Sequence, residues 1–510
     1  MKLTRLAACV LLFFVGGTAS AGQPHVVFII ADDIGWNDLG CYGSPSSRTP
    51  NIDAFAETAT RFDNAYLTAS SCSPSRASLL LGRYPHNCGK AGELHRPMPE
   101  HLVGTAFTAL LREAGYHAEL VGKHHMSVER PDGSPRPLIK PAFDAVSRGR
   151  VPGNRSGAAP WAETIRDRPT DRPCVFWFAS SDAHRPWDGD LDWDAAKYGP
   201  KHDPAAVVPP APMPDTPETR QDFASYLNEV TRFDYFVGEV LATLAGEGIA
   251  DDTVVIVTSD NGRPFPRAKT RLHDPGMKMP LLVRLPAEYR QPATTDALAS
   301  AVDVAPTVLD LCGVAVPETV QGVSLLPLLT ESRPVRRFAF SEHNWHDHAA
   351  HGRSVRDADG YLYVRNARPD GSPWIGPSDS IRSPSHGALV DLRGESPDRL
   401  SPAQRDVFAS PRPAEELYFT PDDPGQVSDL IDDAGHADKR DELRGILDRW
   451  QAATADDLPD DPSVTFMDLG TGEVLPKYLD ERGRRRKERY MRTAPGEASG
   501  ASRVNDPGPF

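Results

Sequence analysis

The chain contains little cysteine, and its cysteines do not follow a metal-binding pattern. Six of its 510 residues are cysteine, and Cys9 lies in the N-terminal apolar stretch. The remaining cysteines show no CxxC or other zinc-site spacing, so the sequence gives no sign of a cysteine-bound zinc. Their odd number would leave at least one thiol unpaired in an exported protein. Cys174 and Cys312 lie in apolar stretches and are expected to be buried core thiols.

The chain also lacks an excess of positive charge. It has 56 Lys and Arg against 71 Asp and Glu, a net charge of -15 at pH 7 and a pI near 5.5. This balance argues against a general nucleic-acid-binding protein. It does not bear on small anionic substrates, because these respond to the local field of a pocket. The overall composition is typical of a soluble globular protein, and the length suffices for a large core.

Long apolar runs are absent beyond the N-terminus. Lys2 and Arg5 precede an apolar run at residues 6–15, and Ala-Ser-Ala at 19–21 forms a small-residue cleavage pattern. This arrangement predicts a secretory signal peptide over residues 1–21, since the run is too short to span a bilayer. No membrane span is expected elsewhere. We therefore expect an exported protein, periplasmic or extracellular, or in a lysosome-like compartment in a eukaryote.

Apolar β-rich runs alternate with helical patterns over the first two thirds of the chain. The strand-like runs are residues 25–30, 173–180, 253–258 and 280–285. The helical patterns are residues 49–62, 105–116 and 219–248. This alternation predicts an α/β fold with a large, mostly parallel sheet flanked by helices. In such sheets, functional sites form at the carboxyl ends of the strands.

The composition changes after about residue 330. Charged, proline-rich segments surround short strand-like stretches such as 336–343, and a helical pattern covers 437–454. We expect the main domain to cover 22–335 and a smaller C-terminal α+β subdomain to cover 336–478. Residues 479–510 are basic and then rich in Gly, Pro and Ser, so a disordered tail is expected there.

Two polar pairs directly follow predicted buried strands. Asp32 and Asp33 follow the first strand, and Asp260 and Asn261 follow the strand at 253–258. Adjacent carboxylates repel each other unless a positive charge lies between them. The first pair alone fits a helix cap or a solvated turn as well as a metal site. Because both pairs lie at the same edge of one sheet, together they predict one site for Ca²⁺ or Mg²⁺, which prefer oxygen ligands.

Several cationic and imidazole side chains also follow strand-like stretches. Lys123 and His125 follow one such stretch, His184 follows the strand at 173–180, and Lys269 follows the second polar pair. Each residue alone is more often a solvated surface residue or a hydrogen-bonded histidine. Together, beside a metal, they are suited to bind a small tetrahedral anion.

Cys72 begins a predicted helix in the stretch SSCSPSRASLLLGR. Ser71 or Ser73 could cap this helix, and Pro74 fits its first turn. A helix N-terminus favours a negative ligand or a thiolate. Arg76 lies one turn further on and could face the same point. Taken as a bare thiol, Cys72 could therefore be a nucleophile or a metal ligand.

Residues 72–83 match C-x-P-S-R-x-x-x-L-x-G-R, which resembles the signature of the type I sulfatases. The flanking motifs GK-x-H at 122–125 and SDNG at 259–262 are similar to those of the same family. The resemblance runs from about residue 24 to about residue 455 and implies an alkaline phosphatase-like sulfatase fold. It also implies that a formylglycine-generating or sulfatase-maturating enzyme oxidises Cys72 to Cα-formylglycine, an aldehyde that hydrates to a gem-diol.

The resemblance further implies a role for each site residue. Lys123, His184 and Lys269 would hold the sulfuryl oxygens, and His184 or Lys269 would protonate the leaving group. Arg76 would orient the gem-diol, one hydroxyl of which attacks sulfur to give a covalent sulfo-enzyme intermediate. His125 would take the proton of the second hydroxyl, so that sulfate leaves and the aldehyde returns. The implied ligands of one Ca²⁺ are Asp32, Asp33, modified residue Cys72, Asp260 and Asn261.

Several stretches, among them NGRPFPRAKT at 261–270, resemble the N-sulfoglucosamine sulfohydrolase branch of the family. This implies hydrolysis of the N-sulfate of glucosamine in heparin- or heparan-type glycans. Lys269 departs from the arginine expected there in the animal enzymes but preserves the charge. Residues 341–356 are expected to line the substrate pocket, with His343 and His346 as candidate substrate-binding residues.

Three other functions are compatible with these motifs. They are an O-sulfatase acting on sulfated carbohydrates or aryl sulfates, a phosphonate or phosphate monoester hydrolase, and a non-catalytic sulfated-glycan-binding protein with an unmodified cysteine. The sequence does not fix the oligomeric state, for which a homodimer is one option.

Overall fold

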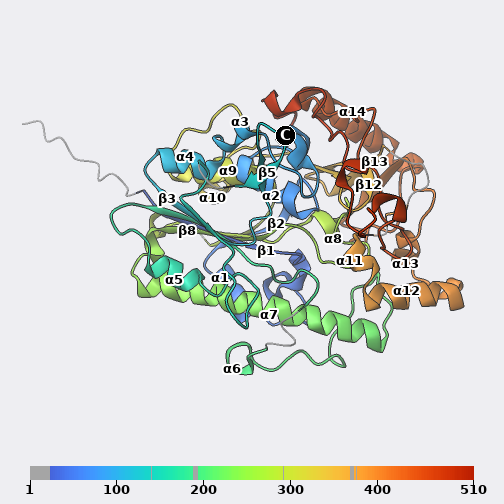
Figure 1. Cartoon of the computed structure of the whole chain (residues 1–510), viewed down its shortest axis with the longest axis horizontal. Helices are drawn as coiled ribbons and strands as arrows, with labels where there is room; N and C mark the ends of the chain where they lie inside the picture. The colour runs from blue at the N-terminus through green and yellow to red at the C-terminus, as the bar shows by residue number, and fades with distance from the viewer. Residues whose placement is uncertain (1–22, 139–140, 188–192, 291, 368–372, 375) are drawn as a thin grey trace, which may run out of the picture.

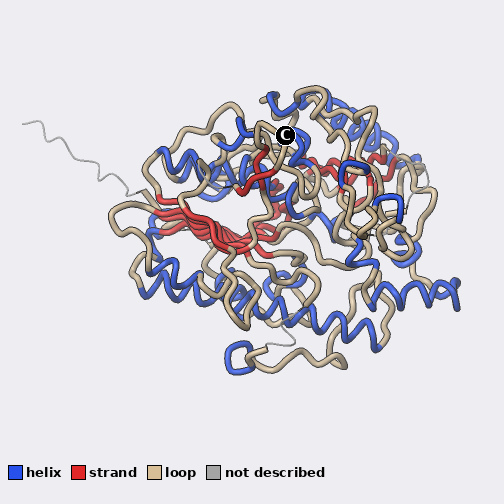
Figure 2. The backbone as a smooth tube through the Cα atoms, in the orientation of Figure 1, coloured by secondary structure: helices blue, strands red, loops and turns tan. Residues whose placement is uncertain are grey.

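An eight-stranded sheet forms the centre of the computed structural model (Figures 1 and 2). Its strands are β1 (His25–Ala31), β2 (Thr60–Tyr66), β3 (His117–Gly122), β6 (Ala145–Ser147), β7 (Cys174–Ala179), β8 (Thr253–Ser259), β9 (Leu281–Arg284) and β10 (Ala293–Ser300). Their order is β10-β2-β9-β8-β1-β7-β3-β6. The adjacent strands β8, β1, β7, β3 and β6 are all parallel, whereas β9 is antiparallel to both neighbours. The expected mostly parallel α/β sheet is confirmed.

The structure describes residues 23–138, 141–187, 193–290, 292–367, 373–374 and 376–510. The predicted signal peptide, residues 1–21, lies outside the described residues. Within the described ranges, no helix is long and apolar enough to cross a membrane.

Helices cover both faces of the sheet (Figure 1). One face carries α1 (Pro50–Ala56), α5 (Trp161–Arg166) and the long α7 (Pro217–Gly246). The other carries α2 (Cys72–Leu81), α3 (Glu100–Val103), α4 (Phe107–Glu113), α9 (Val304–Leu311) and α10 (Leu326–Glu331). Short elements complete this part: β4 (Ser127–Glu129), β5 (Pro135–Pro137), α6 (Ala195–Tyr198), α8 (Asp274–Met277) and the 3-10 segment η3 (Pro85–Gly92).

The side chains of β1 alternate between the two layers. Phe28 packs in a cluster with Leu80 of α2, and Ile29 packs in a second cluster with Phe233 of α7. Burial on both faces explains why this strand is a continuous apolar run in the sequence.

A four-stranded antiparallel sheet forms the smaller C-terminal subdomain. Its strands, in spatial order, are β11 (Phe338–Trp345), β12 (Ala349–Asp357), β13 (Tyr361–Asn366) and β14 (Glu415–Phe419). Its helices are α11 (Ser378–Ile381), α12 (Pro384–Glu395), α13 (Pro402–Val407) and α14 (Ala437–Thr454). The ring of Trp450 in α14 stacks on Phe340 of β11, with centroids 5.0 Å apart. The expected α+β subdomain is therefore confirmed.

Buried charges join the two parts of the molecule. The His86 Nδ1 atom in η3 lies 3.0 Å from a carboxylate oxygen of Glu342 in β11 and 3.9 Å from one of Asp456. Arg353 in β12 donates to both oxygens of Asp456, at 2.5 and 2.6 Å. Burial disfavours a charged His86, but Glu342 and Asp456 outweigh it and raise the pKa of the imidazole. Two carboxylates thus face an arginine and an imidazole across this contact.

One predicted helix is too long. The helical pattern at residues 49–62 ends as a helix at Ala56, and β2 begins at Thr60. The apolar spacing of the helix continues into the strand, because β2 is buried on both faces at its far end.

The expectation of a disordered tail over 479–510 is wrong in this structure. The ring of Tyr490 is 1% exposed and packs against Phe466, with centroids 4.6 Å apart. The Arg83 guanidinium, at the end of the helix that starts with Cys72, donates to the backbone oxygen of Val504 at 2.6 Å. The basic side chains of this segment lie mostly on its outer side. The composition therefore did not reveal the few buried residues that hold the segment in place.

Replacing Tyr490 with alanine tests this packing. Removal of a fully buried aromatic ring should lower the free energy of unfolding by about 3–5 kcal/mol, as measured by urea unfolding. The exposed Arg482→Ala of the same segment is the control and should change stability by less than about 0.5 kcal/mol. Equal stability of the Tyr490 variant and the wild type would mean that the segment does not pack as described.

Candidate active site

The predicted site residues meet at the carboxyl edge of the parallel strands. Asp32 follows β1, and Asp260 follows β8, its neighbour in the sheet, with Ala31 opposite Ser259 in the register. The backbone N–H of Asp33 donates to a carboxylate oxygen of Asp260 at 3.2 Å. The two polar pairs therefore converge, as the sequence predicts.

Three carboxylates and one thiol form the centre of the site. Asp32, Asp33, Asp260 and Cys72 offer ligand atoms that all lie within 4.8 Å of one another. The three carboxylates are fully buried, and the Cys72 sulfur lies 3.7 Å from Asp32 Oδ1 and 4.0 Å from Asp33 Oδ1. Neighbouring carboxylates repel each other, and burial removes the water that would stabilise their charge. Such a cluster therefore needs positive charge beside it.

Two lysines supply part of that charge. Lys123 Nζ donates to Asp32, and Lys269 Nζ lies 2.7 Å from Asp33 Oδ1. Burial opposes the charged form of both lysines, but the facing carboxylates outweigh it and raise the pKa of each ammonium group. Lys269 is 0% exposed and lies beneath the site.

Arg76 supplies the third positive charge and leaves one donor unused. Its Nε donates to Asp260 Oδ2 at 2.8 Å, and its Nη1 donates to the backbone oxygen of Lys123 at 2.9 Å. Its Nη2 is buried and has no hydrogen-bond partner among the described residues. One N–H group of this buried guanidinium therefore remains available as a hydrogen-bond donor.

Asn261 leaves an acceptor unused in the same place. Its amide nitrogen donates to Asp33, while its Oδ1 is buried without a partner among the described residues. A buried unpaired polar atom costs about 1–3 kcal/mol. A cation bound by Asn261 Oδ1 and the carboxylates would remove this cost, so the donor set fits a hard divalent metal ion.

The serines around Cys72 do not cap its helix as expected. Ser71 occupies the N-cap position without a side-chain cap bond, and its Oγ lies 2.8 Å from His346 Nδ1. The Ser73 Oγ accepts a hydrogen bond from the backbone N–H of His95 at 2.8 Å. Both serines therefore bond to neighbouring segments around the start of α2.

The surroundings of Cys72 do not favour a thiolate. Burial raises the pKa of the Cys72 thiol far above its ordinary value, and Lys123 and Lys269 offset this only in part. The thiol is therefore neutral at physiological pH. Of the alternatives left open by the sequence, an activated cysteine nucleophile is the one that this environment disfavours.

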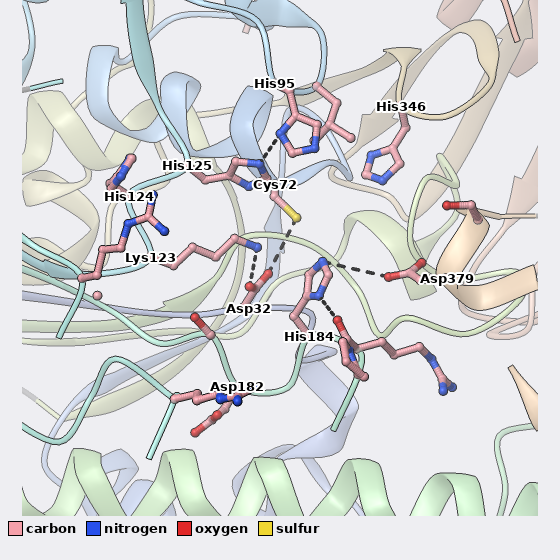
Figure 3. Close-up of a pocket in the computed structure, with 18 of the residues that line it drawn as sticks. Asp32, Cys72, His95, Lys123, His124, His125, Asp182, His184, His346 and Asp379 are labelled. Atoms are coloured by element: carbon pink, nitrogen blue, oxygen red, sulfur yellow. Dashed lines mark hydrogen bonds and ion pairs between the residues drawn. The ribbon is translucent and has the colours of Figure 1, made fainter. Parts of the chain in front are cut away.

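A cavity of about 580 Å³ opens above Cys72 (Figure 3). Of the predicted residues, Asp32, Cys72, Lys123, His125, His184 and His346 line it. His343 is not among the described lining residues: it lies within β11, and its ring is 6.0 Å from that of Trp374. His343 is 1% exposed, so the structure does not place the side chain at the cavity wall where the sequence leads one to expect it.

His125 is paired with a histidine that the sequence did not single out. Its Nε2 lies 2.6 Å from His95 Nδ1 (Figure 3). Burial, reinforced by Lys123, lowers the pKa of His125 well below its ordinary value, and burial lowers the pKa of His95 to about 4. Both rings are neutral near pH 7, so His125 can accept a proton.

His184 faces a carboxylate from the C-terminal subdomain. Its Nε2 lies 4.0 Å from Asp379 Oδ2 in α11 (Figure 3). Burial opposes ionisation of Asp379, but Lys269 and His184 outweigh it and lower the pKa of the carboxyl. Asp379 follows no predicted strand and belongs to no recognised motif, so no signal in the sequence marked it.

Comparison with known proteins decides the family. The family model described as Sulfatase matches residues 24–314, more than half of the chain. The chain belongs to the sulfatase family. A second model, the C-terminal part of N-sulphoglucosamine sulphohydrolase, matches residues 267–362 of this sulfatase.

Two curated relatives align over most of this sulfatase. It is 31% identical over 486 residues to N-sulphoglucosamine sulphohydrolase of Homo sapiens, covering 88% of this chain and 94% of the relative. It is 26% identical over 479 residues to an ulvan-active sulfatase of Formosa agariphila, covering 85% and 76%. The chain is thus a sulfuric ester or sulfamate hydrolase of this family.

Solved structures share the fold. One, determined with its substrate D-glucosamine-2-N,6-O-disulfate, superposes with a TM-score of 0.59 at 18% identity, covering 84% of this chain and 98% of that one. A phosphonate monoester hydrolase of Agrobacterium radiobacter gives 0.61 at 18% identity, covering 86% and 99%. The expected alkaline phosphatase-like sulfatase fold is confirmed.

Replacing Arg76 with methionine tests the charge balance of the site. The change leaves Asp260 buried without its cation, so the free energy of unfolding should fall by about 3–5 kcal/mol. Urea unfolding without added divalent ions measures it, since such an ion would replace the lost charge. The control Arg333→Met breaks an ion pair whose partners are both 63% exposed and should cost about 0–1 kcal/mol. Similar losses in the two variants would contradict the buried pairing.

Proposed function

We propose that this sulfatase is an exported enzyme that removes sulfate from N-sulfated glucosamine in heparin- or heparan-type glycans. Support comes from the alignment with N-sulphoglucosamine sulphohydrolase over 88% of the chain. The observation that carries the proposal is a buried cysteine at the start of α2, next to three carboxylates and at the bottom of a cavity. Export rests on the signal peptide expected at residues 1–21.

The surroundings of residue 72 fit Cα-formylglycine better than cysteine. The free Arg76 Nη2 offers a hydrogen bond to an oxygen that a thiol lacks. The neutral His125 can accept a proton from a hydroxyl. Formylglycine supplies, as its hydrate, two hydroxyls on one carbon, which lets the site release sulfate after attack. A formylglycine-generating or sulfatase-maturating enzyme is the partner that this modification requires.

The same cluster fits one Ca²⁺. Asp32, Asp33, Asp260 and Asn261 would hold it together with an oxygen of modified residue 72. When bound, the ion supplies Lewis-acid stabilisation of negative oxygens. The three buried carboxylates already face Lys123, Lys269 and Arg76, so the dication would leave an excess of positive charge for a sulfate group.

The remaining residues bind the sulfate group and move protons. Lys123 and Lys269 stabilise the negative charge that develops on the sulfuryl oxygens. His184, held near Asp379, is placed to donate a proton to the departing nitrogen. Arg76 orients the attacking oxygen, and His125 accepts the proton that must leave before sulfate is released.

The substrate panel tests the proposal. Purified wild-type protein should release sulfate from N-sulfated glucosamine faster than from 6-O-sulfated glucosamine or p-nitrophenyl phosphate, measured by ion chromatography or by p-nitrophenol release. Cys72→Ala should abolish turnover while keeping the thermal unfolding temperature. Peptide mass analysis should show residue 72 about 18 Da lighter than cysteine, the loss expected for formylglycine. No sulfate release from the N-sulfated sugar would overturn the proposed substrate.

Metal removal tests the cofactor. Chelator-treated protein should show a lower thermal unfolding temperature and no activity, and Ca²⁺ should restore both, because the ion binds only the folded site. Asn261→Ala should raise the Ca²⁺ concentration needed for half of this shift about tenfold, equivalent to about 1.4 kcal/mol. Asn64→Ala, on β2 and outside the cluster, is the control. A shift that is the same in all three proteins would exclude Asn261 as a ligand.

A further inference from the structure

The cavity above Cys72 holds more positive charge than one sulfate group needs. Besides Lys123, arginines from several segments line it, among them Arg148, Arg150 and Arg185. Arg185 is already used, since it donates to both carboxylate oxygens of Asp222 at 2.8 Å. Arg148 and Arg150 are exposed at the cavity wall, and neither guanidinium makes an ion pair or hydrogen bond with a described residue.

The segment that carries these arginines, residues 148–155, is called the arginine loop here. It begins directly after β6, whose Ser147 lies opposite Val121 of β3 in the register. Lys123 follows β3, so the loop starts beside the strand end that carries a catalytic lysine. The first residues of the loop and Lys123 therefore follow neighbouring strands of the same sheet.

Glycine contacts fix the loop beside these strands. A Cβ atom on Gly149 would lie 2.1 Å from the backbone oxygen of Gly157, and one on Gly157 would lie 2.9 Å from the Cα of Gly122. Gly149, Gly157 and Gly122 have positive φ, at +59°, +80° and +113°, a conformation that favours glycine. The backbone segments also approach one another so closely that a side chain would not fit between them. Gly149 lies between the two arginines, and Gly122 directly precedes Lys123. The guanidinium groups thus extend from a fixed base.

Ser156, which directly follows the arginine loop, is bonded to the segment that carries His184. The backbone N–H of Ser181 donates to the backbone oxygen of Ser156 at 2.6 Å, and Ser180 Oγ donates to the same oxygen at 3.4 Å. Arg148 lies close enough to His124 to contribute to the lowered pKa of that imidazole, after burial. The arginines therefore face the cavity beside the sulfate-binding residues and at its solvent end.

The shape of the cavity determines which part of a bound substrate lies near residue 72 and which part lies near solvent. Cys72 is 1% exposed at the bottom, whereas Arg148 and Arg150 are exposed at the wall. A volume of about 580 Å³ lies within the range of cavities that hold whole small ligands, about 300–1,000 Å³. A sugar whose sulfate reaches residue 72 would thus direct its other substituents toward the arginine loop.

We infer that Arg148 and Arg150 form a subsite for a second anionic group of the substrate, either a carboxylate or a second sulfate. The inference rests on the proposed function and adds to it that the preferred substrate carries two anionic groups. Guanidinium groups suit both ligands, because each offers parallel N–H donors to paired oxygens. The two sources of the anion are a second sulfate on the same sugar and the carboxylate of an adjoining uronic acid.

The test compares substrates with and without the second anion. One pair is N-sulfated glucosamine and N,6-O-disulfated glucosamine. The other is an N-sulfated glucosamine–uronic acid disaccharide and the same disaccharide with its carboxyl reduced to an alcohol. For each pair, the ratio of kcat/KM values measures the benefit of the second anion.

In the double variant Arg148→Ala/Arg150→Ala, the ratio should fall about tenfold for the pair that supplies the natural anion, through KM rather than kcat. The pair that responds identifies the source. Arg148→Lys/Arg150→Lys should retain part of the ratio, and Arg333→Ala, 63% exposed and outside the cavity lining, should retain all of it. Thermal unfolding confirms that each variant is folded.

Unchanged ratios for both pairs in the folded alanine variant would overturn the inference. This outcome is distinct from failure of the proposed function. If the wild type released sulfate only from O-sulfated sugars, the N-sulfate specificity would be wrong. The ratio measured on O-sulfated sugars with and without a second anion would then still decide the role of the arginine loop.

Discussion

The structure depends on the balance of three buried carboxylates by three cations at one edge of the sheet. Lys269 and Arg76 are buried, and Lys123 lies at the cavity wall. Asp32, Asp33 and Asp260 are fully buried, and each contacts one of Lys123, Lys269 and Arg76. Such a cluster is costly unless every charge is met, so each residue must be held in place by a rigid element. The parallel strands β1, β8 and β3 of one sheet do this for Asp32, Asp260 and Lys123, which follow them, and the helix α2 does it for Arg76. Among the described residues, the Asn261 oxygen and Arg76 Nη2 are two buried atoms of this cluster that have no hydrogen-bond partner in the protein.

The C-terminal part of the chain completes the site and fixes α2. Asp379 and His346 form one side of the cavity, and Arg485 reaches it from the segment after residue 478. The other end of α2 is held by Arg83, which donates to backbone oxygens of Ser502 and Val504. The last segment of the sequence therefore packs against the C-terminal end of the helix that begins with Cys72.

Local sequence predicted the residues that follow strands, and it failed where position depends on distant packing. The runs at 25–30 and 253–258 are apolar on both faces, which identified β1 and β8 and thereby the places of Asp32 and Asp260. His95 and Arg148 lie in loops and Asp379 lies in the short helix α11, and only the tertiary fold brings them to the cavity. His343 was misplaced because the register of β11 decides which way it points, and the sequence does not reveal that register. Tyr490 was missed because a single buried aromatic ring in a basic segment leaves the composition unchanged.

Burial has different effects on the histidines of the site and on its lysines and arginines. Burial keeps His95 and His125 neutral, so these rings can exchange protons but add no charge. Positive charge in the cavity must then come from lysine and arginine, which remain protonated when a carboxylate or solvent is near. This explains how a chain with a net charge of -15 can bind an anionic substrate. The acidic residues lie mostly on the outside or in paired clusters, while the unpaired cations are placed where the substrate enters.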